Sequence, residues 1–195
     1  MENWKDEISK IESHFGHHEK RDWIQDIKYS QYLIQTYPND VEVNVRVIYL
    51  LHNIILEENH TSEVAKLVSV ILPEYFKISR NIFSENAEYL FFIGKILHIA
   101  EWYFGIYEVD KLATQTTAFI MQEKALELDS NNLLYKWAVM ITIGTKEEVR
   151  NLSNIILNGE NQSYIKWLQT KGFPGIYILD GLKYYLTSGA SLAIA

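Results

Sequence analysis

The sequence predicts an all-α fold, and three observations support this prediction. Apolar residues recur at intervals of three and four along most of the chain, the spacing that gathers them on one face of a helix. The 195 residues include only 9 glycines and 3 prolines, too few for the many turns of a β-sandwich or barrel. Hydrophobic residues make up 48% and charged residues 22% of the chain, which excludes a disordered protein.

The first three helices are read from stripes of apolar residues. The stripe from Trp4 to Phe15 predicts a helix that ends at Gly16. A second helix begins at Trp23 and ends before Pro38, because the residue before a proline is pushed out of helical dihedral angles. The valines at the start of residues 41–56 alternate as in a strand, but the apolar stripe continues too long for one, so a third helix is predicted.

The later helices follow polar breaks. Thr61 or Ser62 is expected to cap a helix that runs to about residue 79, and Pro73 is expected to kink or split it. Ser84 is expected to cap the next helix, and a sixth is predicted over residues 109–128. Four more are predicted over residues 133–143, 146–158, 163–170 and 175–186.

The chain also contains an internal repeat. Similar polar breaks lie at Pro38, Ser84 and Ser130, 46 residues apart, and each precedes an apolar helix. The helices align without gaps, so that, for example, Val47, Ile93 and Val139 take equivalent positions. A helix pair of this length cannot bury its apolar face alone, and stacking such pairs makes a continuous core.

Two segments of this repeat resemble the tetratricopeptide family. Residues 124–132 (Lys-Ala-Leu-Glu-Leu-Asp-Ser-Asn-Asn) resemble the end of one repeat and the start of the next, and residues 86–94 resemble the opening of a first helix, with Gly94 at the family's small-residue position. The period of 46 departs from the usual ~34 residues. The resemblance implies antiparallel helix pairs stacked as a short right-handed array over residues 20–158. An irregular helical bundle is the alternative.

The whole chain, residues 1–195, is predicted to form a single all-helical domain. Residues 1–19 hold the N-terminal helix, and residues 159–195 hold helices that cap the repeats.

Catalytic and metal-binding patterns are weak. The chain has no cysteine, no glycine-rich phosphate loop and no His-Glu-x-x-His sequence. Gly16 interrupts the histidine cluster of residues 14–19, and Glu57-x-x-His60 has no second copy to complete a di-iron site. We therefore expect no enzyme activity, metal or cofactor, although His98 and Glu101 could form an acid–base pair.

The repeat register predicts a partner-binding groove. If the first helix of each repeat lines a concave face, two repeats place aromatic, charged and imidazole side chains on it. The predicted partner-binding residues are Glu42, Tyr49, His52, Glu88, Phe91, Lys95 and His98. The equivalent positions of the third repeat are Leu134, Trp137, Ile141 and Gly144, and these are expected to be covered by the C-terminal helix.

Charge indicates the kind of partner. The net charge is −7, and residues 84–132 carry eight acidic and three basic residues, which argues against nucleic acid and favours a basic protein. The start of the chain has no secretory signal, and no apolar run reaches the ~20 residues of a membrane helix, so we expect a cytoplasmic protein.

Two functions are consistent with this pattern. In size, acidity and helical character the chain is similar to bacterial immunity proteins, which bind and neutralise a cognate toxin domain, often a basic nuclease. The alternative is a tetratricopeptide-type adaptor or chaperone that binds a peptide or a secreted effector.

Overall fold

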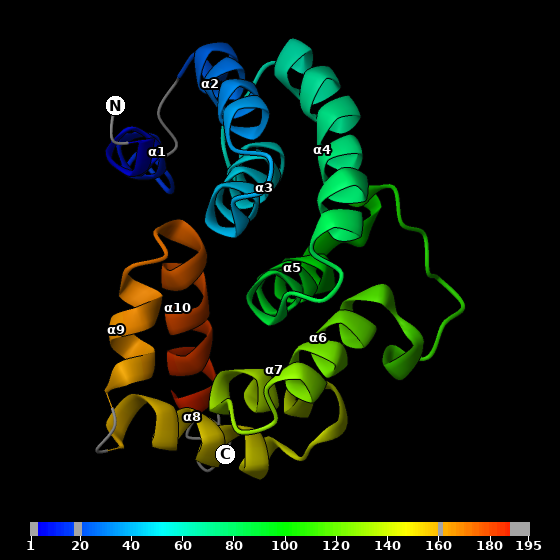
Figure 1. Cartoon of the computed structure of the whole chain (residues 1–195), viewed down its shortest axis with the longest axis vertical. Helices are drawn as coiled ribbons and strands as arrows, with labels where there is room; N and C mark the ends of the chain where they lie inside the picture. The colour runs from blue at the N-terminus through cyan, green and yellow to red at the C-terminus, as the bar shows by residue number, and fades with distance from the viewer. Residues whose placement is uncertain (1–3, 18–20, 160–161, 188–195) are drawn as a thin grey trace, which may run out of the picture. The chain divides into compact units, whose positions relative to one another are not determined.

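The structure is a computed structural model that describes residues 4–17, 21–159 and 162–187. These residues form ten α-helices and two short 3-10 helices and contain no strand, which confirms the predicted all-α fold (Figure 1). The contacts divide the chain into two compact units, and the single domain expected from the sequence stays a prediction. The first unit comprises Met1–Ser84 and Ala100–Tyr107, and the second comprises Glu85–Ile99 and Glu108–Ala195.

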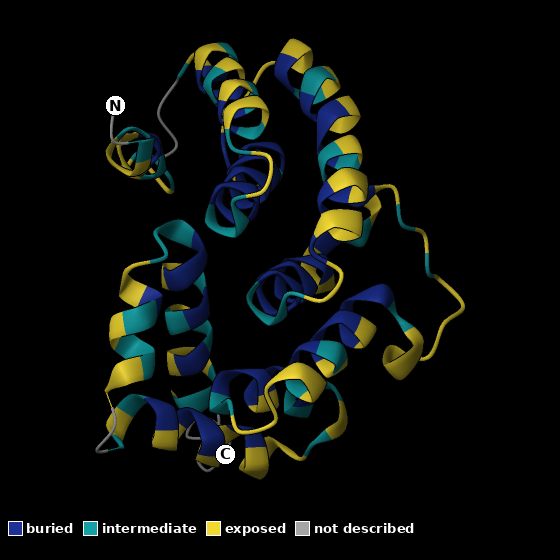
Figure 2. Cartoon of the chain, in the orientation of Figure 1, coloured by how far each residue is buried: buried dark blue, intermediate teal, exposed yellow. Residues whose placement is uncertain are grey.

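The first unit is built around one buried helix. Its elements are α1 (Trp4–Glu12), α2 (Trp23–Thr36), α3 (Val41–Leu56), α4 (Ser62–Ile82) and the 3-10 helix η1 (Glu101–Phe104). Both α2 and α4 pack against α3, and η1 packs against α4. Every residue of α3 from Val43 to Ile55 is buried, because α2 and α4 pack against this helix and its Arg46 side chain pairs with Glu12 of α1 (Figure 2).

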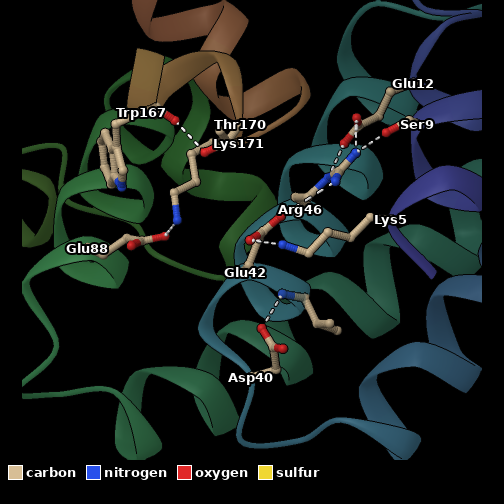
Figure 3. Close-up of polar contacts among 11 residues, drawn as sticks. Lys5, Ser9, Glu12, Asp40, Glu42, Arg46, Glu88, Trp167, Thr170 and Lys171 are labelled. Atoms are coloured by element: carbon tan, nitrogen blue, oxygen red, sulfur yellow. Dashed lines mark hydrogen bonds and ion pairs between the residues drawn. The ribbon is translucent and has the colours of Figure 1, made fainter. Parts of the chain in front are cut away.

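A buried arginine ties α1 to α3. The Arg46 guanidinium donates to both carboxylate oxygens of Glu12, at 3.0 and 2.5 Å, and to the Ser9 hydroxyl at 2.8 Å (Figure 3). Both charged side chains are almost fully buried. Losing one partner would leave the other charge buried and unpaired, which is strongly destabilising. This arginine therefore has a structural role.

The second unit contains the remaining helices. They are α5 (Ala87–Ala100, all but its last residue), the 3-10 helix η2 (Ala113–Gln115), α6 (Thr117–Leu128), α7 (Leu133–Ile143), α8 (Lys146–Asn158), α9 (Ser163–Gln169) and α10 (Phe173–Thr187). Consecutive helices from α6 to α8 pack against each other, and α10 packs against α8 and α9.

Gly94 allows α5 to approach α6 closely. A Cβ atom at this position would lie 2.8 Å from Gln122 Cγ and 3.0 Å from the Ala118 carbonyl oxygen. The sequence analysis placed a small residue here for close helix packing, and the structure confirms that closeness. The stacking of helix pairs into a tetratricopeptide-like array stays a prediction.

Most predicted helix bounds agree closely with the structure, but three details were wrong. Helix α4 continues through Pro73 without a break. The side chain that caps α5 is Asn86, which accepts from the Tyr89 amide at 2.9 Å, and not Ser84. Residues 109–116 do not belong to the sixth helix, which Thr116 caps by accepting from the Phe119 amide.

Candidate functional site

The predicted partner-binding residues fall in both units. Glu42, Tyr49 and His52 lie on α3 in the first unit, while Glu88, Phe91, Lys95 and His98 lie on α5 in the second. Within each group the residues share one helix, as the repeat register predicted. The joint groove that would combine the two groups stays a prediction.

In the first unit, the predicted residues do not form an open surface. Tyr49 is 0% and His52 only 3% exposed, so the expectation that these side chains face a groove is wrong. The cause is that other helices of the first unit cover α3, which is buried from Val43 to Ile55. The Glu42 carboxylate is half-buried and accepts a hydrogen bond from Lys5 at 2.7 Å (Figure 3).

His52 lies in an aromatic cage. Its ring stacks on Phe104 with centroids 5.5 Å apart and meets the edge of Tyr103 at 6.2 Å. Its Nε2 atom is buried and has no hydrogen-bond partner among the described residues. Burial lowers the pKa of the imidazole from 6.5 to about 4, so His52 is neutral at pH 7. The surroundings of this side chain identify it as a core residue.

In the second unit, two predicted residues are engaged within the protein. Phe91 is 0% exposed and packs against Tyr135 with ring centroids 5.1 Å apart, so its expected place on a binding surface is also wrong. Glu88 accepts a hydrogen bond from Lys171 at 2.6 Å, and the same ammonium lies over the Trp167 ring (Figure 3). These contacts connect α5 to the segment after α9.

The other two, Lys95 and His98, line a pocket of about 640 Å³ in the second unit. We name it the Lys95 pocket. It is lined by Lys95 and His98 of α5, Ala113, Trp137, Ile141 and Thr142, and Tyr177, Asp180, Gly181, Tyr184 and Tyr185 of α10. Ile141, Tyr184 and Tyr185 also line an adjoining pocket of about 1090 Å³ between α7, α8 and α10.

Lys95 is the most unusual residue of this pocket. Its side chain is only 7% exposed, and its Nζ atom lies 4.8 Å from the centre of the Trp137 ring. Among the described residues, no carboxylate or other hydrogen-bond acceptor pairs with this ammonium. Burial lowers the pKa of Lys95 from 10.5 to about 8, so the amine is still mostly protonated at pH 7.

Trp137 forms a rigid wall of the pocket. The indole is 1% exposed, and its Nε1 atom donates to the Ser153 hydroxyl at 3.0 Å. Tyr185 meets the indole edge-on with centroids 5.9 Å apart. Gly181 brings α10 close, since a Cβ atom there would lie 3.3 Å from the indole. The C-terminal helix therefore lies against Trp137, as the sequence analysis expected.

The titratable groups around Lys95 differ in their charge. His98 is exposed, yet desolvation by the surrounding protein and the nearby Lys95 charge lower its pKa, while Gln122 acts in the opposite direction. Burial raises the pKa of Tyr177 to about 12, so this phenol stays neutral. Asp180, the one carboxylate among the described residues that line the pocket, is exposed and pairs with Lys183 at 2.8 Å.

A second candidate surface lies on α6. It combines exposed apolar and acidic side chains, and we name it the α6 face: Ile120, Glu123, Lys124, Glu127 and Leu128. Lys124 contacts Glu127 at 4.0 Å and Glu85, which precedes α5, at 3.2 Å. The acidic residues of this face outnumber its single lysine, so its local charge is negative.

The described residues contain no group of three or more His, Asp or Glu side chains placed to hold a metal ion. Of the histidine cluster considered in the sequence analysis, His18 and Glu19 lie outside the described residues. No helix of the described parts of the chain has the length and apolarity required to cross a membrane.

The sequence analysis did not identify Tyr177 and Tyr185 as site residues. They lie on α10, outside the repeat, and only the fold brings them to α5 and α7. The available signal was the aromatic content of the C-terminal helix.

Comparison with known proteins gives no match, since no family model, no curated protein and no solved structure is significantly similar to this chain.

Proposed function

We propose that this chain functions by binding another protein and that its partner is a basic domain, as in a toxin-neutralising immunity protein. The observation that carries this proposal is the α6 face. Ile120 is 49% exposed and lies one turn from Glu123 and two turns from Glu127 on the same side of the helix. Apolar side chains supply contact area, and the surrounding carboxylates complement a basic surface.

The charge of the chain supports the same proposal. A net charge of −7 would speed the encounter with a basic partner, and this effect weakens as salt screens the charges. A nuclease toxin exposes a positive surface where it binds nucleic-acid phosphates. An acidic protein face can occupy that surface and so block the substrate.

The test starts with a tagged copy of the full chain used as bait at low salt. A single basic partner recovered at equal stoichiometry would then be purified for kinetic measurements. The double charge reversal Glu123→Lys with Glu127→Lys should lower its association rate at low salt by at least tenfold, and the loss should shrink as salt rises.

The matched control reverses two exposed carboxylates elsewhere, Glu74→Lys with Glu147→Lys, which makes the same change in net charge. This control should lower the association rate much less. Equal losses for the two double variants would mean that total charge, and not the α6 face, determines binding. An association rate that does not respond to salt or to either reversal would contradict the proposal.

A tetratricopeptide-type adaptor that binds a peptide or a secreted effector is the second candidate. It is supported by the close approach of α5 to α6 at Gly94, which is the kind of packing that this repeat requires. A bound apolar peptide would show little dependence of affinity on salt, in contrast to a charge-steered toxin. The salt dependence measured above therefore separates the two functions.

A further inference from the structure

The Lys95 pocket holds a buried cation without a counter-ion. Lysine is almost never fully buried unless it is paired, because removing an ammonium from water costs free energy that only a partner restores. Lys95 is 7% exposed, and no anion within the described residues pairs with it. Of the lining residues that the structure describes, Asp180 is the one carboxylate, and Lys183 already neutralises it at 2.8 Å.

We propose that this pocket binds an organic carboxylate carried on an aromatic or apolar body. The carboxylate pairs with the Lys95 ammonium, and the body lies against Tyr184 and Tyr185, which line the same pocket. This inference goes beyond the binding of a basic protein, because it concerns another surface and a ligand of opposite charge.

The charge of the site favours a monoanion. One ammonium lines the pocket, and no second cationic side chain does so among the described residues, so a phosphate dianion would keep uncompensated charge. The histidine at the pocket wall does not supply that charge, since His98 has a lowered pKa and is neutral at pH 7. The phenols of Tyr177 and Tyr185 are also neutral, because burial raises both pKa values.

The size and the aromatic lining of the site favour an apolar or aromatic body. The volume of about 640 Å³ lies within the range of small-molecule pockets, roughly 300–1,000 Å³. Trp137 is held by its hydrogen bond to Ser153, so its ring keeps a fixed orientation. Rigid aromatic walls with one placed polar group are typical of sites that orient a ligand.

The same chemistry has two sources, a free small acid and the C-terminal carboxylate of a peptide. Both present one carboxylate next to an apolar group. The experiment therefore includes both kinds of probe, each with a neutral counterpart that lacks only the charge.

The first experiment measures binding of indole-3-acetate, phenylacetate and benzoate to the full chain by calorimetry. At least one acid should bind, and its amide should bind at least tenfold more weakly. A tripeptide Gly-Gly-Phe with a free C-terminus is compared with its amidated form in the same way. Tighter binding of the free peptide would assign the ligand to a chain end, and tighter binding of the small acids would assign it to a metabolite.

Substitutions of Lys95 test whether the affinity for the acid depends on its ammonium group. Lys95→Met should lower the affinity for the best acid at least tenfold while the helical circular dichroism is retained. Lys166→Met, which removes an exposed lysine on α9 that does not line the pocket, should leave that affinity unchanged. Lys95→Arg keeps the charge and should retain part of the binding.

A second measurement reports directly whether a ligand occupies Lys95. An amine-reactive ester labels lysines that are partly deprotonated, and mass spectrometry reports the labelling of Lys95. The acids should protect Lys95 but not Lys166 at up to about 10 mM, a concentration that fills even weak sites. Failure of all the probes to protect Lys95, or equal binding of acid and amide, would overturn the proposal.

Discussion

Replacing Lys95 by methionine should stabilise the protein at neutral pH. Methionine has nearly the same length and volume but carries no charge, so the packing against Trp137 is retained. The change removes a buried ammonium that has no counter-ion among the described residues. The expected result is a higher free energy of unfolding for the variant than for the wild type.

The magnitude follows from the pKa of the amine. Burial lowers it from 10.5 to about 8, and one pKa unit corresponds to 1.36 kcal/mol, so the buried charge costs roughly 3 kcal/mol. The contact with the Trp137 ring at 4.8 Å returns about 1 kcal/mol, the usual size of a cation–π interaction. The variant should therefore gain about 2 kcal/mol at pH 7.

The gain should also depend on pH. Between pH 8 and 10.5 the unfolded chain binds the Lys95 proton and the folded chain does not, so wild-type stability rises with pH across this window. The advantage of the variant is complete below pH 8 and disappears near pH 10.5. Tyr177, whose pKa burial raises to about 12, lowers the stability of both proteins alike at high pH, so the difference between them isolates Lys95.

Urea denaturation at pH 7 and at pH 10 measures this difference, provided that the slope of the free energy against urea is unchanged. Lys166→Met is the control and should change stability by less than about 0.5 kcal/mol, as surface substitutions do. A variant that is less stable at pH 7, or an advantage that does not change with pH, would refute the reasoning.

Three further predictions concern the core. The free energy of unfolding of the wild type should fall by up to about 3 kcal/mol as the pH drops from 6.5 to 4, because His52 accepts a proton in this range only in the unfolded chain. His52→Phe should remove this fall in urea titrations. Parallel pH profiles for the variant and the wild type would contradict the prediction. Gly94→Leu should cost a few kcal/mol through overpacking against α6, and an unchanged unfolding midpoint would contradict the close helix approach. Tyr49→Ala and Phe91→Ala should each destabilise the fold by roughly 3–5 kcal/mol, whereas weaker partner binding with intact stability would return these residues to a surface role.

The helices could be predicted because their signals are local. The bounds of α3, α7 and α8 follow from apolar periodicity together with a polar residue at each start, and the structure contains all three at the expected places. Residues 109–116 were misassigned because the carboxylate of Glu108 turns the chain by accepting from the Thr117 amide and hydroxyl at 2.7 Å each. The local pattern of apolar and polar residues does not predict that contact.

The exposure of the predicted site residues could be predicted only in part. The repeat register put Lys95, His98, Trp137 and Ile141 at equivalent positions, and these residues line one pocket. The same register put Tyr49 at an exposed position, whereas its side chain is fully buried. The position of a residue within a repeat indicates which side of its helix the residue lies on. Whether the residue is buried depends on which elements pack against that side, and this is known only from the tertiary structure.

The stability and the ligand affinity of Lys95 variants bear on one question when they are measured together. Truncating a lysine that serves only the fold should destabilise the protein, as truncating Arg46 would by breaking its pair with Glu12. Lys95 has no such partner among the described residues, so the Lys95→Met variant should be more stable than the wild type and should bind the carboxylate ligand more weakly. Substituting a binding residue is expected to raise stability and lower ligand affinity together, because the burial of such a residue costs free energy that only the ligand offsets.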